Sequence, residues 1–357
     1  NQTSPFFKNF LGGPQVQAFE KAFAKYVGVK YAVSMANGTL ALNAAYTALD
    51  LHPPEGTDKP SEIICSPWTF VATASEIVRA GYRPVFADVE VGNGALSAQA
   101  AREAITPRTG AIVLMHPLGS MCSRHSFEPV SEMEGLPLFV EDSCQALRRG
   151  IECWGDIACF SFQQTKSAQT GEGGTAVTND KEAYDRLCYL RNMGLKYGPF
   201  KERFKNMVAT NLRLTEIQAV IGLYALKGYD KVVKHQLMLG EIIKESMEES
   251  TWLFPQEPWT ENGYIFAGKL NPSIPNSETV LTRANFLKKV KRWNQGIPGR
   301  VIGGGYSELV YELPAFRHFA RACPVAEMWR DHAVWFDIRQ MSVDEVKSIS
   351  REIERFK

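Results

Sequence analysis

The sequence predicts an α/β fold, in which a mostly parallel sheet is covered by helices on both faces and is followed by a small α+β segment. Three observations predict it. Short apolar runs alternate with stretches of helical periodicity over the first half of the chain, which is typical of a parallel sheet. Polar residues follow directly after several of these runs, where such sheets hold their ligands. The chain of 357 residues is also long for one compact domain.

The first half of the chain supplies the large sheet. Apolar residues from Val16 to Val27 recur every three or four positions and predict an amphipathic helix over residues 13–28, ended by Gly28. Further helices are expected at 40–49, 69–80 and 97–105. Strands are expected at 31–35, 61–66, 83–88, 111–115, 138–142, 157–162 and 174–178.

The second half begins with helices. Residues 181–192 and 213–250 have helical periodicity, and the second, longer helix is expected to connect two domains. Beyond residue 252 we expect a strand at 264–270, helices at 279–293 and 342–355, and a glycine-rich loop that contains Gly296, Gly299, Gly303, Gly304 and Gly305. The expected division is a large domain of residues 1–240 and a small C-terminal domain of residues 241–357.

The composition of the chain gives no support to nucleic-acid binding, a membrane span or a metal site. The net charge is +1, from 40 basic and 39 acidic residues, so nothing favours binding to nucleic acid. No run of 18 apolar residues occurs, and we expect no membrane span. The seven cysteines are scattered without a CxxC pair, which favours a reducing, cytoplasmic compartment and no metal site.

One group of residues predicts the chemistry. Lys166 follows the strand residues Phe160-Ser161-Phe162 and precedes the glycine-rich turn 171–174, and Asp142 ends an apolar strand upstream. An amine, an acid and nearby hydroxyl groups at strand ends are what a pyridoxal phosphate (PLP) site requires. The lysine holds the aldehyde, the acid pairs with the pyridinium nitrogen, and hydroxyls and amides bind the phosphate.

Around these residues the chain resembles the DegT/DnrJ/EryC1/StrS family of PLP-dependent sugar aminotransferases, of aspartate aminotransferase fold type I. The resemblance extends over nearly the whole chain, in order. Besides Lys166 and the turn 171–174, it rests on Gly13–Val16, Asn37–Leu42, Pro67–Thr73, Glu141–Ala146, Phe160–Phe162, Asn211–Glu216 and Cys323–Glu327. It implies a seven-stranded sheet in the large domain and PLP as the cofactor.

The resemblance also implies the role of each site residue. Lys166 and Asp142 are the catalytic pair, and Lys166 moves the proton of the substrate. Trp68 would stack on the cofactor ring, and Gln145 would face its 3′ oxygen. Asn211 would reach the phosphate of a partner subunit, so that a homodimer shares its sites. The remaining phosphate contacts would be Gly38, Thr39 and Ser161.

Substrate contacts are expected from His116, Arg213 and Tyr306, and Arg213 would either receive the carboxylate of the donor or brace the interface between subunits. The chain departs from the family pattern in two places that affect the amine acceptor. Residues 115–122 lack the usual acidic residue after the histidine, and residues 303–306 replace a common tyrosine-histidine substrate loop.

The expected activity is transfer of an amino group from glutamate or glutamine to a keto-sugar or keto-cyclitol, in the biosynthesis of a natural product such as an antibiotic or of a cell-surface glycan. Two alternatives remain open. One is a PLP-dependent dehydratase or aromatising synthase of the aminohydroxybenzoate type. The other is a PLP-binding regulator without turnover. The acceptor ketone, and whether it is linked to a nucleotide, stay undetermined at this point.

Overall fold

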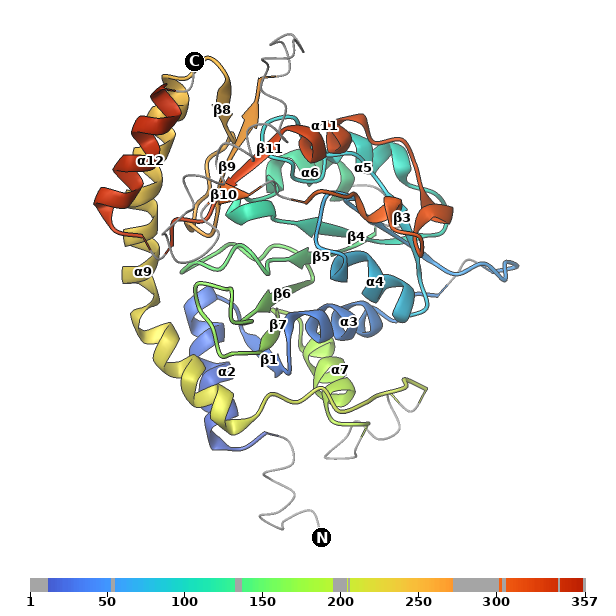
Figure 1. The fold of residues 1–357 in the computed structure, drawn as a ribbon. Helices are drawn as coiled ribbons and strands as arrows, with labels where there is room; N and C mark the ends of the chain where they lie inside the picture. Colours follow the sequence, from blue (N-terminus) through green and yellow to red (C-terminus); the bar gives the residue numbers. More distant parts are fainter. Residues whose placement is uncertain are drawn as a thin grey trace.

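The computed structural model describes residues 12–52, 55–131, 137–194, 204, 206–271, 302–303, 306–339 and 341–355 (Figure 1). A seven-stranded sheet has the order β1-β7-β6-β5-β4-β2-β3. Its strands from β2 to β6 pair in parallel, whereas β7 is antiparallel to both β6 and β1. The strands are β1 (Tyr31–Met35), β2 (Glu62–Cys65), β3 (Arg83–Phe86), β4 (Thr109–Met115), β5 (Leu138–Asp142), β6 (Ile157–Ser161) and β7 (Gly174–Thr178).

Helices cover both faces of this sheet, as predicted. Alternate strand residues contribute to different hydrophobic clusters: Val140 of β5 packs with α3, α4 and α7, whereas its neighbour Phe139 packs with α5 and α6. Phe160 of β6 packs with α2 and α9. The helices in question are α2 (Pro14–Val27), α3 (Gly38–Ala48), α4 (Ala72–Arg79), α5 (Ala98–Ala104), α6 (Arg124–Ser131), α7 (Lys181–Arg191) and α9 (Glu216–Glu248). Because successive residues of a strand point to opposite faces, both faces of the sheet are apolar and are covered by helices. The result is three layers, with the sheet between two layers of helices.

A second, antiparallel sheet of four strands follows in the order β10-β11-β9-β8. Its strands are β8 (Leu253–Pro255), β9 (Phe266–Leu270), β10 (Ile302–Gly303) and β11 (Ala333–Phe336). The helix α12 (Val343–Arg355) packs with α9, and a separate hydrophobic cluster joins them to this sheet. Figure 1 shows α9 passing alongside both sheets.

The chain between β10 and β11 returns to the large sheet. It contains η2 (Val310–Glu312), η3 (Arg317–Phe319) and α11 (Pro324–His332). The Asp88 carboxylate, just after β3, accepts hydrogen bonds from the backbone amides of Val325 and Ala326, at 3.0 and 2.8 Å, and so caps α11.

The predicted seven-stranded, mostly parallel sheet is confirmed. The α4 helix is shorter than expected, and α6, η1 (Pro117–Gly119) and α11 were not predicted. The predicted helix 279–293 and most of the glycine loop lie outside the described residues. A domain boundary at residue 240 stays a prediction, and that position falls inside α9. None of the helices in the described ranges combines the length and apolar character needed to cross a bilayer.

Candidate active site

Predicted site residues gather at one edge of the large sheet. Asp142 ends β5, and Ser161 ends the neighbouring parallel strand β6. Since β7 is antiparallel to both β6 and β1, β1 runs in the same direction as β6, and Gly38, which follows β1, lies at the same edge. The carboxyl ends of parallel strands are where such sheets bind ligands.

Asp142 is a buried carboxylate that accepts hydrogen bonds from neutral donors. Its Oδ2 atom accepts one from the Thr73 hydroxyl at 2.7 Å, and Oδ1 accepts one from the Cys144 amide at 3.2 Å. The side chain is only 7% exposed, and among the described residues no cation forms a salt bridge with it. A buried carboxylate needs a positive partner. The site therefore fits a cationic ring nitrogen.

Gly38 allows the start of α3 to lie against Ser161. A Cβ atom on Gly38 would lie 2.7 Å from the Ser161 Cβ and 3.2 Å from the Cys144 Sγ. The Asn37 side chain already accepts from the Leu40 amide, and the first amides of the helix have no acceptor within it. Amides at a helix start beside a serine hydroxyl are suited to a phosphate group.

Lys166 lies in a loop held by backbone hydrogen bonds. The Gln164 amide donates to the Gly171 carbonyl at 2.8 Å, and the Lys166 amide donates to the Gln163 carbonyl at 2.8 Å. The Nζ atom donates to the Tyr264 hydroxyl at 3.3 Å. Tyr264 precedes β9 and was not predicted as a site residue, because its position in the sequence marks only the start of a strand.

Lys166 and Asp142 both lie near the Cys144 thiol. Burial and the Asp142 carboxylate hold the pKa of the Cys144 thiol well above its usual range, and Lys166 opposes that shift. Gly38, Ser161 and Cys144 thus lie together, with Asp142 and Lys166 both near Cys144, and the roles predicted for these residues stay predictions.

Trp68 does not lie where a ligand would reach it. Its side chain is 0% exposed, and its ring packs against Trp329 at a centroid distance of 4.9 Å and edge-on against Tyr306 at 5.7 Å. Phe70, two residues on, is 59% exposed and lies two residues before the start of α4, the helix that carries Thr73. Stacking on a ring needs an open face, so the structure favours Phe70 over Trp68.

Gln145 and Tyr306 form a pair at the base of the site. The Gln145 Oε1 atom accepts from the Leu118 amide at 2.7 Å, and Nε2 donates to the Tyr306 hydroxyl at 2.7 Å. Burial raises the pKa of Tyr306. Both polar atoms of the Gln145 side chain are therefore engaged within the protein, and its predicted contact with the cofactor stays a prediction, as does the substrate contact of Tyr306.

His116 is not available to a substrate. Its ring is 0% exposed, Nδ1 accepts from the Cys122 amide at 3.0 Å, and Nε2 lies 3.0 Å from the Glu141 carboxylate. Because Nδ1 is an acceptor, Nε2 carries the proton and donates to Glu141. The histidine thus braces the strand ends behind Asp142, and the structure does not support its predicted role as a substrate contact.

Of the two residues expected to meet a partner subunit or a donor, Asn211 lies at the surface and Arg213 is half-buried. Asn211 is exposed, and its Oδ1 atom accepts from the Arg213 amide at 3.3 Å. Arg213 forms an isolated bridge with Met35, at the end of β1. The roles predicted for Asn211 and Arg213 require a second subunit or a donor, and both stay predictions.

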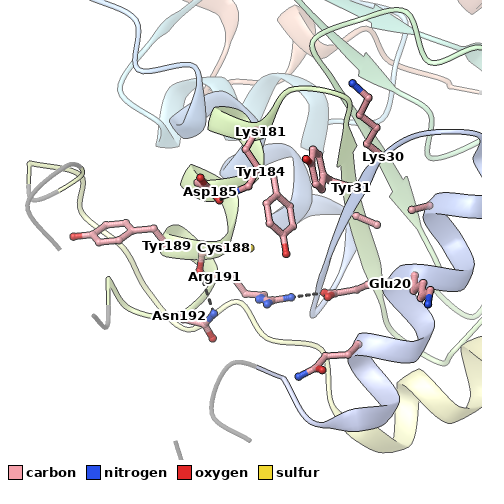
Figure 2. Close-up of a pocket in the computed structure, with 14 residues that line it drawn as sticks. Glu20, Lys30, Tyr31, Lys181, Tyr184, Asp185, Cys188, Tyr189, Arg191 and Asn192 are labelled. Carbon is pink, nitrogen blue, oxygen red and sulfur yellow. Dashed lines mark hydrogen bonds and ion pairs between the residues drawn. The ribbon is translucent and has the colours of Figure 1, made fainter. Parts of the chain in front are cut away.

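A cavity of about 560 Å³ lies elsewhere, between α2, β1 and α7 (Figure 2). Figure 2 shows Arg191 facing Glu20 across it, where the two side chains form an ion pair. The Tyr31 and Tyr184 rings stack at 4.7 Å in its wall. None of the predicted site residues lines this cavity, so it is separate from the sheet edge that carries Lys166 and Asp142.

Comparisons with known proteins identify the family of the chain. The sequence model of the DegT/DnrJ/EryC1/StrS aminotransferase family matches residues 7–354. The chain is 32% identical over 240 residues to the GDP-perosamine synthase of Vibrio cholerae, a match that covers 66% of this chain and 63% of that protein. It is 30% identical over 324 residues to the dTDP-4-amino-4,6-dideoxy-D-glucose transaminase of Shigella dysenteriae, covering 88% of this chain and 81% of that one.

Solved structures share the fold. An aminotransferase from Psychrobacter cryohalolentis superposes with a TM-score of 0.84 at 26% identity, covering 96% of this chain and 91% of that one. The match to the Vibrio cholerae protein, in contrast, spans less than two thirds of that relative's length.

Proposed function

The chain belongs to the DegT/DnrJ/EryC1/StrS aminotransferase family, and from this premise we propose that it is a PLP-dependent aminotransferase. It moves an amino group from an amino acid, glutamate or glutamine, to a ketone on a sugar or cyclitol. The relative from Shigella dysenteriae is a transaminase whose name specifies a dTDP-linked amino sugar, which supports a sugar acceptor. The product would enter a cell-surface glycan or a natural product such as an antibiotic.

The observation that carries the proposal is the environment of Asp142. The carboxylate is buried, two neutral groups hydrogen-bond to it, and no described cation pairs with it. PLP supplies a cationic ring that accepts an electron pair from the substrate. Asp142 would keep the ring nitrogen protonated, because a negative carboxylate close to that nitrogen favours its charged form.

Other residues would hold the cofactor in place. The first amides of α3, at Gly38 and Thr39, would bind the phosphate together with the Ser161 hydroxyl. Phe70 would cover one face of the ring. Gly38, Thr39 and Ser161 follow or end strands at the sheet edge where Asp142 ends β5, and Phe70 follows β2, whose carboxyl end lies at the same edge.

Lys166 would perform the proton transfer. Its amine would hold the aldehyde of the cofactor, which supplies the electron-accepting ring. The same amine, once free, would act as the base that takes the proton from the donor carbon and as the acid that gives it back, because one group held close to the reacting atoms can serve in both directions. With the acceptor ketone, the same amine works in the reverse direction.

A homodimer with shared sites also belongs to the proposal. Four apolar side chains of α9 are exposed at helical spacing: Ile217, Val220, Ile221 and Tyr224. We name them the α9 stripe. An exposed apolar stripe of this kind is typical of a protein interface. A second copy seated on the stripe would bring Asn211, just before α9, toward the phosphate of its partner.

The proposed location is a reducing, cytoplasmic compartment. All seven cysteines are free thiols, and no two of them form a disulfide. Free thiols are typical of such compartments.

The function is tested by incubating the PLP-loaded protein with glutamate or glutamine and a panel of keto-sugars and keto-cyclitols. Formation of the keto acid together with an aminated acceptor, identified by mass, is the expected result. Loss of water from the acceptor without gain of nitrogen would point instead to a dehydratase or aromatising synthase. If no amino donor changes the absorbance of the bound cofactor, the protein would instead be a PLP-binding regulator without turnover.

A further inference from the structure

The Tyr264 side chain is contacted by two cations. The Lys166 Nζ atom lies 3.3 Å from the hydroxyl oxygen and 4.8 Å from the ring centroid. The Arg339 guanidinium carbon lies 4.7 Å from the same centroid. The tyrosine is only 7% exposed, so its hydroxyl is a buried acceptor with a defined donor. Cations over an aromatic ring are held by its negative face.

Arg339 is fixed in this position by two further contacts. Its guanidinium forms a forked pair with Asp337, with Nε to Oδ1 at 2.7 Å and Nη2 to Oδ2 at 2.6 Å. Its Nη1 atom donates to the backbone carbonyl of Thr165, the residue directly before Lys166. Because Asp337 balances its charge, the arginine can lie near the lysine amine without strong repulsion.

From these contacts we propose that Tyr264 is a positioning residue for Lys166, and that Arg339 fixes both the Tyr264 ring and the lysine loop. The inference rests on the proposed function. When the donor displaces the amine from the cofactor, the four-carbon lysine chain is free to rotate. The Tyr264 hydroxyl would then give the released amine one defined acceptor, which limits the positions of the amine while it carries the proton.

The contact itself is tested without the cofactor, by a double-mutant cycle in unfolding. Tyr264→Phe keeps the ring and removes the hydroxyl, and Lys166→Met removes the amine. We expect the two effects on the unfolding equilibrium constant to be non-additive by a factor of about 3 to 10, the range of one hydrogen bond. Tyr26→Phe is the matched control, since this buried tyrosine donates to Asp230 at 2.6 Å, away from the lysine. The effect of Tyr26→Phe on the unfolding equilibrium should add to that of Lys166→Met. If the effects of Tyr264→Phe and Lys166→Met are also additive, the proposed contact is refuted.

The role in proton transfer is tested in the loaded protein. With a donor deuterated at the α-carbon, Tyr264→Phe should slow the change of the cofactor spectrum by about 3- to 10-fold and raise the deuterium isotope effect, whereas donor affinity and the Tyr26→Phe control stay unchanged. An unchanged isotope effect would refute the positioning role. If wild-type protein shows no response to any donor, the proposed function fails, and the double-mutant cycle still decides whether the amine is held.

A second variant covers the case in which Tyr264→Phe does not fold. Arg339→Lys keeps the positive charge but cannot form the fork to Asp337 and the bond to Thr165 together. We expect it also to raise the isotope effect. An isotope effect equal to wild type would contradict the assignment of Arg339.

Discussion

The Thr73 hydroxyl donates a 2.7 Å hydrogen bond to Oδ2 of Asp142, although the two residues belong to different elements, α4 and the end of β5. Thr69 lies 2.8 Å from the same threonine oxygen, so two hydroxyls lead to the carboxylate. All three side chains are buried. The acid that we assign to the cofactor nitrogen is thus oriented before any ligand binds.

Thr73→Val should weaken this orientation. The substitution keeps the shape of the side chain and leaves a buried acceptor with one donor fewer, which costs about 1–3 kcal/mol in the free energy of unfolding. Affinity for PLP should fall as well. Urea titration and cofactor titration measure the two effects. Thr47→Val, which removes a hydroxyl bonded to the Asn43 carbonyl within α3, should change the stability by less than about 0.5 kcal/mol and leave the affinity unchanged.

Gly38→Ala should interfere with phosphate binding. The added Cβ would lie 2.7 Å from the Ser161 Cβ, so α3 or β6 must shift, and overpacking of this kind costs about 1–3 kcal/mol. We expect PLP affinity to fall by about tenfold or more, while the affinity for pyridoxal, which lacks the phosphate, changes less. Gly228→Ala is the control: no atom lies within 4 Å of its Cβ position, and it should stabilise α9 by about 0.5–1 kcal/mol. Equal losses for PLP and pyridoxal would argue against the phosphate assignment.

Phe70→Ala should weaken PLP binding, whereas Trp68→Ala should lower the stability of the fold. Phe70 is 59% exposed, so its loss should spare stability but weaken PLP binding by about 0.5–1.5 kcal/mol, the value of an aromatic contact. Trp68 is fully buried among other aromatic rings, and its truncation should cost about 3–5 kcal/mol of stability. Thermal unfolding and spectroscopic PLP titration distinguish the two. Normal PLP affinity in the Phe70 variant would remove it from the site.

Tyr224→Asp should separate the proposed dimer. Tyr224 is 83% exposed on the α9 stripe, and a carboxylate there would be buried without a partner when two copies meet. Sedimentation equilibrium should show a monomer, with weaker PLP binding because Asn211 of the other copy is lost. Val78→Asp on α4, at 43% exposure, is the control and should leave the dimer intact. A wild-type protein that is monomeric at micromolar concentration would contradict this proposal.

The sequence allowed the positions of the strand ends in the candidate site to be predicted. Lys166, Asp142, Ser161 and Gly38 each follow or end an apolar run, and the topology of a parallel sheet brings such positions to one edge. The spacing of apolar residues in the strands and helices likewise predicted a sheet between two layers of helices, because both faces of a buried strand must be covered.

Side-chain direction was harder to predict. Trp68 and Phe70 are both aromatic, lie in one loop and have the same sequence signal, yet only the packing of Trp329 on Trp68 decides which of them is open. His116 follows a strand like the other site residues, but its ring is turned to Glu141. Tyr264 lies just before β9 of the second sheet, and no local pattern in the sequence could relate it to Lys166.

The most direct test of the central claim is to reduce the PLP-loaded protein with borohydride, digest it and locate the cofactor by mass spectrometry. The account predicts that the reduced cofactor is attached to Lys166, and that Lys166→Ala protein shows neither this adduct nor the visible band of the bound cofactor. A cofactor attached to another lysine, or an undiminished band in the Lys166→Ala protein, would contradict it.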